Sequence, residues 1–273
     1  MSSKKLIINA DDFGYSNHTA ELTIQCFDAG ILSSATLMPN MPAFGKAVTF
    51  AMEHPEFSYG LHLCLTDERP ISNPRDIPSL VDAHGKFWVT REFAKRAFSG
   101  RISMEDICRE TSAQLTYIKQ AGLDVTHIDT HGHVHKIPTV FWALRKALKN
   151  SGITTIRRMQ NLFYHQPGQA SQCYNNLANI FIRQLGKTTD YFLMVTGTLD
   201  EQDDDWWQFS IDNLPEGVTE IGFHPGLDEK QRRMDTLPVL RSGSALLEKN
   251  GIELISFNEL GQASDVSVEC MTK

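Results

Sequence analysis

The chain has 273 residues, a formal net charge of −7 at neutral pH and 41% hydrophobic residues. This composition is that of a folded globular protein with a substantial core, and it excludes a disordered chain. An acidic protein is also poorly suited to broad, non-specific binding of nucleic acid, which requires a basic surface. A neutral or cationic small substrate is therefore expected.

The cysteines and the amino-terminal segment bear on localisation. Five cysteines are present without any CxxC pair, which favours a reducing compartment. The apolar stretch at residues 6–10 is too short for the core of a signal peptide and is followed at once by two aspartates. A run of about 18 apolar residues, which a membrane span would need, is absent from the sequence. We therefore expect a cytoplasmic protein with no membrane contact.

Short apolar segments alternate with segments of helical periodicity along the chain. Apolar runs predict strands at residues 5–10, 31–38, 59–65, 125–130, 154–158, 191–195, 218–223 and 252–257. Helical spacing predicts helices at about 20–30, 43–52, 103–122, 140–151, 172–185 and 236–249. Ser103 and Asp106 form a predicted capping box at the start of the third of these helices.

Such alternation predicts an α/β fold in which right-handed helical crossovers join parallel strands. The seven or eight strands could close into a (β/α) barrel or form an open, doubly wound sheet. In both cases the functional site is expected at the carboxyl ends of the strands. Neither a repeat nor a linker divides the sequence, so residues 1–273 are predicted to form a single domain.

Four of the ten histidines lie within residues 127–135, which read His-Ile-Asp-Thr-His-Gly-His-Val-His. If the backbone stays extended, one face carries all five of the polar groups His127, Asp129, His131, His133 and His135. Imidazoles bind zinc and similar ions, and a carboxylate can orient a ligating ring. The segment therefore predicts a metal site, although an exposed histidine-rich loop would give the same pattern.

Further metal-binding or acid–base side chains follow other predicted strands. Asp11 and Asp12 follow the first strand, and their side chains should diverge, so that one could bind metal while the other faces substrate. His62 and His224 lie at or near the ends of two more strands. Taken singly, the aspartates are more typical of a solvated turn and the histidines of hydrogen-bonded structural residues. Because the carboxyl ends of parallel strands converge, we expect the four segments to form one site.

Other candidate features are weaker. Gly186-Lys187-Thr188 does not qualify as a phosphate-binding loop, because Phe181 stands where the upstream glycine is required. Cys64 lies in an apolar setting that predicts an inert thiol. The acidic residues 200–205 and the following Trp206-Trp207 predict a solvated loop with one anchored aromatic ring, with a sugar-stacking lid as the alternative.

Five ordered segments resemble the YdjC-like carbohydrate deacetylases. They are Asn-Ala-Asp-Asp-Phe-Gly at 9–14, Gly-Leu-His-Leu at 60–63, the histidine-rich residues 127–135, Gly-Phe-His-Pro at 222–225 and Ile-Ser-Phe-Asn-Glu-Leu at 255–260. The resemblance spans nearly the whole chain and implies a distorted (β/α) barrel with one divalent metal ion. An Asp-His-His ligand set favours zinc chemically, whereas family members are often described with magnesium.

The resemblance also implies roles for individual residues. It implies Asp12, His62 and His131 as metal ligands, Asp11 as general base on a metal-bound water, and His224 as the acid that helps the amine to leave. Arg157 corresponds to a family arginine near the base, although the sequence around it departs from the family pattern. The remaining residues are assigned to substrate binding or to the surroundings of the ligands: His127, Asp129, His133 and His135.

The implied reaction is hydrolysis of the N-acetyl group of a small amino sugar or short chitooligosaccharide, with release of acetate. One alternative is another metal-dependent hydrolase on the same barrel, a phosphoesterase or a cyclic amidase. Another is a non-catalytic protein that binds sugar or metal, although such a protein would need no spare base like Asp11. The sugar, the metal and the oligomeric state stay open, and a homodimer is allowed.

Overall fold

The computed structural model describes residues 4–165, 167–194, 205–226 and 236–262. In this part of the chain a single parallel sheet has the strand order β5-β4-β3-β2-β1-β7-β6, with β8 beside β1. The strands are β1 (Lys4–Phe13), β2 (Ser34–Leu37), β3 (Ser58–Leu63), β4 (His127–Thr130), β5 (Thr155–Ile156), β6 (Tyr191–Met194), β7 (Gly217–Phe223) and β8 (Glu253–Leu254). Each of the eight predicted strands is present, with bounds shifted by a few residues.

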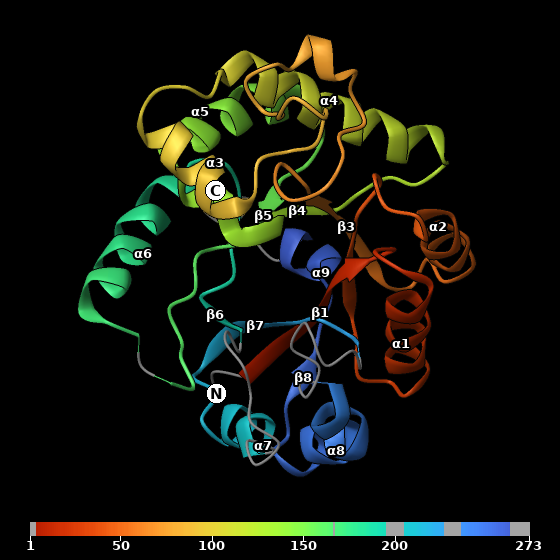
Figure 1. Ribbon diagram of the computed structural model, residues 1–273. Coiled ribbons are helices and arrows are strands. Elements are labelled where there is room, and N and C mark those ends of the chain that lie inside the picture. The colour runs from red at the N-terminus through yellow and green to blue at the C-terminus, as the bar shows by residue number, and fades with distance from the viewer. Residues whose placement is uncertain (1–3, 166, 195–204, 227–235, 263–273) are drawn as a thin grey trace, which may run out of the picture.

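Helices surround the curved sheet (Figure 1). They are α1 (Asn17–Asp28), α2 (Phe44–Glu53), α3 (Thr90–Phe98), α4 (Met104–Gln120), α5 (Pro138–Ala147), α6 (Gln169–Ile182), α7 (Asp205–Asp212) and α8 (Thr236–Lys249). Three short 3-10 helices are η1 (Pro74–Asp76), η2 (His131–Lys136) and η3 (Leu148–Asn150). The short helix α9 (Phe257–Gln262) lies inside the ring, where Figure 1 places it next to β1.

Strand β1 is the centre of the sheet. It pairs with β7 from Lys4 to Ala10 on one side. On the other side its amino end pairs with β8 and its carboxyl half pairs with β2. Among the described residues β5 does not pair with β6, and Thr155 forms only an isolated bridge to Lys187, which precedes β6, so the barrel is incompletely closed. The prediction of an α/β fold with a distorted barrel is therefore confirmed.

The alternation of side chains along β1 separates two cores. Leu6, Ile8 and Ala10 lie in the large hydrophobic core between the sheet and the outer helices. Ile7 points the other way, into a small cluster with Ile255 and Phe257 inside the curve of the sheet. A strand that buries apolar side chains on both faces is typical of a parallel sheet covered by helices. Every second residue of a strand therefore faces the interior of the barrel.

The predicted capping box is partly present. The hydroxyl of Ser103 accepts a hydrogen bond from the backbone N–H of Asp106 at 3.3 Å and begins α4. Such a cap satisfies one of the free N–H groups of the first helical turn. At the other end, α4 stops at Gln120, just before Gly122, whose φ of 90° favours glycine.

Four segments differ from the sequence-based expectation, one of them α9, which begins at Phe257 where the end of a strand was predicted. Residues 131–136 leave the extended conformation and form η2, so only His127–Thr130 are strand. Trp206 and Trp207 belong to α7 and both are buried in the core, where one anchored ring was expected, so they do not form an exposed stacking lid. The acidic residues 200–204, for which a solvated loop is predicted, lie outside the described residues. Helix α3 was not predicted because Phe93 and Ala97 are its only buried residues, which is too few for a clear period.

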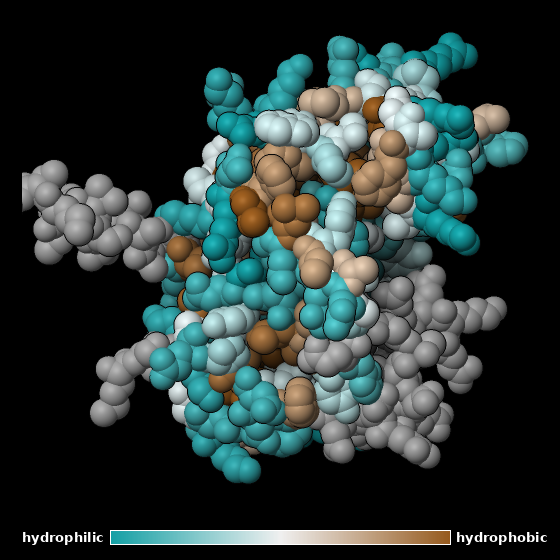
Figure 2. Space-filling view, turned by 90° about the vertical axis from the view of Figure 1, so that its left-hand side faces the viewer, coloured by the Kyte–Doolittle hydropathy of each residue, from teal (hydrophilic) through white to brown (hydrophobic). Residues whose placement is uncertain are grey.

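Surface and cysteine properties complete the description. The face at the left of Figure 1 is largely hydrophilic, with hydrophobic side chains in separate groups (Figure 2). Among the described residues, no helix is both long and apolar enough to cross a membrane. The four cysteines in the described part of the chain are free, and burial raises the pKa of the Cys64 thiol to about 12, as expected for an inert thiol.

Gly60 provides a test of how tightly the inside of the barrel is packed. A Cβ atom at this position would lie 2.6 Å from the ring of His127, which is stacked on Phe257 with ring centroids 3.8 Å apart and so has little room to move. We expect Gly60→Ala to lower the free energy of unfolding by about 1–3 kcal/mol. The measurement is urea-induced unfolding followed by circular dichroism.

Gly45 in α2 is the matched control, since a Cβ there would meet nothing within 4 Å. Alanine is the better helix former, so Gly45→Ala should leave stability unchanged or raise it by up to about 1 kcal/mol. Equal effects of the two substitutions would contradict the packing described around His127.

Candidate metal centre

The inner face of the sheet carries polar side chains where the outer face carries apolar ones. Alternation places them there from six strands or the residues directly after them: Asn9, Asp11, Thr36, His62, His127, Asp129, Arg157 and Glu220. Each of these residues is at most 2% exposed. Buried polar groups are costly unless they are hydrogen-bonded or paired, so the partners of each side chain decide what the site can do.

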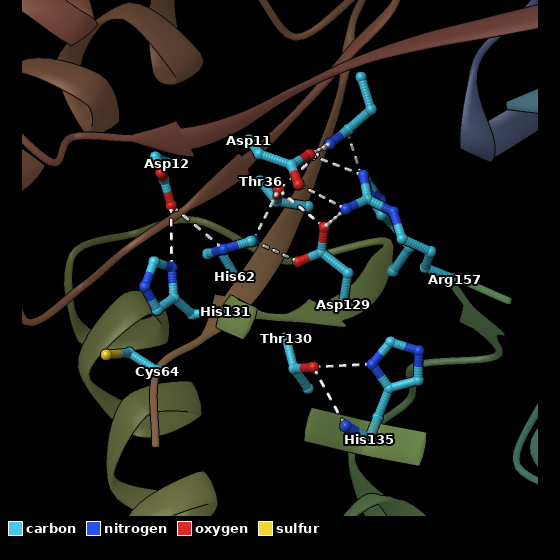
Figure 3. A network of polar contacts seen from close by, with 12 residues as sticks. Asp11, Asp12, Thr36, His62, Cys64, Asp129, Thr130, His131, His135 and Arg157 are labelled. Carbon is cyan, nitrogen blue, oxygen red and sulfur yellow. Dashed lines mark hydrogen bonds and ion pairs between the residues drawn. The ribbon is translucent and has the colours of Figure 1, made fainter. Parts of the chain in front are cut away.

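Arg157 is the cation shared by three buried carboxylates. Its terminal nitrogens donate to both oxygens of Asp11 at 2.6 and 2.7 Å, and one of them lies 2.5 Å from Oδ2 of Asp129. Its Nε donates to Oε1 of Glu220 at 2.6 Å. Figure 3 shows Arg157, Asp11 and Asp129 converging from three different strands or strand ends. This ion cluster fixes the carboxyl group of Asp11 in one orientation.

The pKa values of two of these acids respond differently to the same cation. Burial alone would raise the pKa of Asp11, but the paired Arg157 guanidinium outweighs it and holds this pKa well below its usual range. His62 and His224 add smaller contributions in the same direction. Burial dominates at Glu220 and raises its pKa to about 7. Asp11 is therefore a permanent carboxylate, whereas Glu220 can take up a proton near neutral pH.

A local irregularity of β1 turns Asp12 out of the strand pattern. The register of β1 against β2 shifts between Ala10 and Phe13, and Asp12 has a φ of 59°, which non-glycine residues rarely adopt. As a result Oδ1 of Asp12 lies 3.2 Å from Nε2 of His62 and 3.3 Å from Nδ1 of His131 (Figure 3). Asp11 and Asp12 thus face different partners, as their adjacency in the sequence predicted.

These distances fit the donor atoms of a cation site. Two ligands that are each about 2.1 Å from one ion, at angles between octahedral and tetrahedral, are about 3.0–3.4 Å apart. Nε2 of His62 is buried and forms no hydrogen bond, although Asp12 is so close. The side chains of Asp12 and His131 are 18% and 24% exposed, so solvent reaches this side of the group. Asp12, His62 and His131 could therefore hold one divalent ion.

Asp129 orients His62 for such a role. Nδ1 of His62 lies 2.7 Å from Oδ1 of Asp129, which favours a proton on Nδ1 and directs Nε2 toward Asp12. Burial would lower the pKa of His62, but Asp129 and Asp12 outweigh it and raise this pKa well above its usual value. In the absence of a cation, this raised pKa favours protonation of Nε2, which faces Asp12.

A second group of potential ligands lies deeper and fits a cation poorly. Asp11, His62 and Asp129 also bring one donor atom each within 4.8 Å of one another. However, the guanidinium of Arg157 already contacts both of these carboxylates. A divalent ion would have to share this space with a permanent positive charge.

The extended conformation expected for residues 127–135 is wrong beyond Thr130. Gly132 and His133 have φ values of 64° and 51°, so the chain turns sharply after His131. His135 points to the hydroxyl of Thr130, at 2.7 Å, and burial lowers its pKa to about 3. The five polar residues therefore do not share one face.

The other predicted histidines each have different neighbours inside the barrel. His127 is buried against Phe257 and lies 2.7 Å from the hydroxyl of Thr126 through Nδ1. His133 contacts the ring of Phe192 at 6.0 Å between centroids. His224 directly follows β7, is part-exposed, and is close enough to Asp11 to lower its pKa.

Glu220 was missed by the sequence analysis. A signal was present, because Glu220 is the one charged residue in the strand segment 218–223 and occupies an inward-facing position. A charged side chain at such a position requires a buried partner. Its partner, Arg157, is separated from it by 63 residues and could not be identified from spacing alone.

The fold and this site together define an α/β barrel protein with a candidate metal centre at the carboxyl edge of its strands. Residues 5–250 match the family described as YdjC-like protein, and the chain belongs to this family. A carbohydrate deacetylase of Geobacillus stearothermophilus is 32% identical over 265 residues, which cover 93% of this chain and 96% of that protein. A carbohydrate deacetylase of Clostridium beijerinckii is 31% identical and aligns over 94% of this chain and its own full length.

A solved structure from Enterococcus faecalis V583, described as a proposed cellobiose-phosphate cleavage protein, is 25% identical to this chain. It superposes with a TM-score of 0.74 and covers 95% of this chain and all of its own. The family resemblance expected from the sequence motifs is therefore confirmed.

The buried cluster around Arg157 leads to a stability prediction. Arg157→Met would leave three buried carboxylates without their cation, so the free energy of unfolding should fall by about 3–5 kcal/mol at pH 8. In the native protein the lowered pKa of Asp11 contributes stability at pH values above its unfolded pKa. Without Arg157 the carboxylates gain protons more readily, and the loss should therefore be smaller at pH 5.5. Urea unfolding at both pH values measures this.

Arg101→Met is the control, because Arg101 is exposed and should change stability by no more than about 0.5 kcal/mol. A loss at Arg157 that is small, or equal at the two pH values, would show that the cation does not hold the cluster together.

Proposed function

We propose that this chain is a metal-dependent hydrolase that removes the acetyl group from an N-acetylated amino sugar or short chitooligosaccharide. The family and its relatives named carbohydrate deacetylase support the class of reaction. The observation that carries the metal-dependent mechanism is the convergence of Asp12, His62 and His131, with Asp11 held beside them by Arg157.

In this proposal Asp12, His62 and His131 hold one divalent ion. When bound, the ion would polarise the acetamide carbonyl and make a water molecule more acidic. The two nitrogen ligands favour zinc, while magnesium would need more oxygen or water ligands than Asp12 alone supplies. The part-exposed edge of Asp12 and His131 leaves room for the substrate.

Asp11 acts as the general base that accepts a proton from the attacking water. Its low pKa makes it a weak base, so it cannot retain the proton for long. Arg157 therefore favours release of this proton from Asp11 to another acceptor, which returns Asp11 to its ionised form. The water oxygen attacks the acetyl carbon, the C–N bond breaks, and acetate and the free amine are the products.

His224 is proposed to protonate the departing amine, since it is part-exposed at the same edge of the sheet. Asp129 keeps His62 in position, and Glu220 supports Arg157 from the far side. His133 is proposed to contact substrate, whereas the rings of His127 and His135 contact neighbouring side chains, among them Thr126 and Thr130.

The central experiment separates the base from the metal ligands. Protein purified without a histidine tag is analysed for bound metal and assayed for acetate release from diacetylchitobiose and simpler N-acetylglucosamine derivatives. Asp11→Asn should lower acetate release by about 10²–10⁴-fold and retain the metal. Asp12→Asn should lose both. Asp28→Asn, an exposed acid on α1, is the matched control and should change neither.

Three outcomes would overturn the proposal. Full acetate release by Asp11→Asn would remove the assigned base. Release of phosphate from p-nitrophenyl phosphate, without acetate from any N-acetyl sugar, would indicate a phosphoesterase on the same barrel. A protein that binds sugar and metal but releases neither product would be the non-catalytic alternative.

The assignment of His224 has its own test. His224→Ala should slow release of acetate from an N-acetyl sugar by about 10²-fold or more, because the amine cannot leave without a proton. Hydrolysis of p-nitrophenyl acetate should change much less, since p-nitrophenolate departs unprotonated. Both rates are measured by product release under the same conditions. An equal loss on the two substrates would assign His224 to binding or to structure.

A further inference from the structure

A large basic cavity lies at the amino end of the sheet, opposite to the candidate metal centre. It has a volume of 1030 Å³ and is lined by residues 145–154 and 183–190, which precede β5 and β6. Four basic side chains and one acidic side chain contribute to its lining: Arg145, Lys149, Arg183, Lys187 and Asp190. Such an excess of positive charge is notable in a protein with a net charge of −7.

Two of the four basic side chains have no ion-pair partner among the described residues. Lys149 and Arg183 are exposed and have no carboxylate within ion-pair distance among the described residues. The carboxylate of Asp190 already accepts a hydrogen bond from the backbone N–H of Val218 at 2.9 Å. Burial, and then the charge of Arg183, lower the pKa of the neighbouring Arg158. The cavity therefore attracts anions.

One buried polar group in the lining of this cavity, and one on the neighbouring Arg158, lack partners among the described residues. Thr189 lines the cavity and is 2% exposed, but its hydroxyl makes no hydrogen bond within the described part of the chain. Nε of Arg158 is likewise buried and without a partner, while another of its nitrogens donates to the carbonyl of Thr189 at 3.1 Å. Buried polar groups normally find a partner, and an unmet one costs about 1–3 kcal/mol. A ligand oxygen in the cavity could supply the partner of Thr189.

The wall that contains Gly186-Lys187-Thr188 is rigid. A Cβ atom at Gly186 would lie 2.5 Å from the carbonyl oxygen of Thr154, so only glycine permits this approach. The backbone N–H of Lys187 donates to the same oxygen at 2.7 Å, and the N–H of Ile156 donates to the carbonyl of Lys187 at 2.9 Å. The segment precedes a strand rather than a helix, so it differs from a P-loop. It nevertheless holds its part of the cavity in a fixed shape.

We propose that this cavity binds a small organic phosphate of nucleotide size. Its phosphate groups would contact Lys149 and Arg183, since guanidinium and ammonium groups are the usual phosphate donors. Its apolar part would pack against Leu148, Ile153 and Leu185, which are the aliphatic residues of the lining. The volume is at the upper end of the range of small-molecule sites, about 300–1000 Å³, and suits a ligand larger than inorganic phosphate.

The test uses ADP as the probe with the full chain. Isothermal titration calorimetry at moderate salt, without added divalent metal, should detect saturable binding of ADP. Inorganic pyrophosphate should displace ADP, whereas adenosine should not. In the double variant Lys149→Gln/Arg183→Gln the affinity should fall at least about tenfold, because two charge-assisted contacts are removed.

Matched variants keep the result independent of the proposed reaction. Arg101→Gln/Lys119→Gln removes the same charge from exposed residues outside the cavity and should change ADP affinity by no more than about twofold. Asp12→Asn should leave ADP binding unchanged, and Lys149→Gln/Arg183→Gln should leave acetate release unchanged. The proposal is overturned if ADP does not bind saturably, if adenosine alone competes, if both double variants weaken binding equally, or if Asp12→Asn abolishes it.

Discussion

The interior of this barrel depends on one guanidinium. Arg157 follows β5 at one end of the strand order, while Glu220 lies on β7, five strand positions away. In a flat sheet these strands would be about 24 Å apart, at about 4.8 Å per strand. The 2.6 Å contact between Arg157 and Glu220 is therefore possible only because the sheet curves strongly enough to bring the two strands face to face. The ion cluster and the curvature of the sheet require each other.

Charge inside the barrel is unbalanced in the direction that favours a cation. Asp11, Asp129 and Glu220 share one arginine, and Asp12 lies beside the imidazoles of His62 and His131. Protonation of Glu220 near pH 7 reduces this excess but does not remove it. Buried ion pairs of this kind contribute little net stability, because desolvation offsets their attraction. Their effect is instead to hold Asp11 and Asp129 at fixed positions, and Asp129 in turn orients His62 toward Asp12.

The fold was largely predictable from the sequence because alternation of apolar and polar segments is a local signal. Each predicted strand is present, and Ser103 caps α4 as expected. The convergence of Asp12, His62 and His131 also followed from the topology, since strand ends of a parallel sheet meet at one edge. The resemblance to a known family, rather than spacing, suggested which histidine of residues 127–135 joins the group.

What the sequence did not reveal depends on backbone irregularities and on partners far apart in the chain. The turn after Thr130 requires positive φ at His133 as well as at Gly132, and nothing in the composition of the segment indicates it. The burial of Trp206 and Trp207 depends on their packing in the folded core, whereas the preceding acidic residues suggested exposure. The role of Glu220 depends on a partner 63 residues away. Local pattern carries no information about such contacts.

Asp11 and Asp12 show how the backbone can give neighbouring, chemically identical residues different properties. Asp11 follows the strand alternation, faces inward and is held ionised by Arg157. Asp12 escapes the alternation because β1 is irregular there, and it meets two histidines at a part-exposed edge. Since φ at Asp12 lies in the left-handed region, the surrounding contacts must maintain this conformation against its intrinsic cost. The left-handed conformation of Asp12 thus directs its carboxylate to the two histidines, while the regular strand conformation directs that of Asp11 to Arg157.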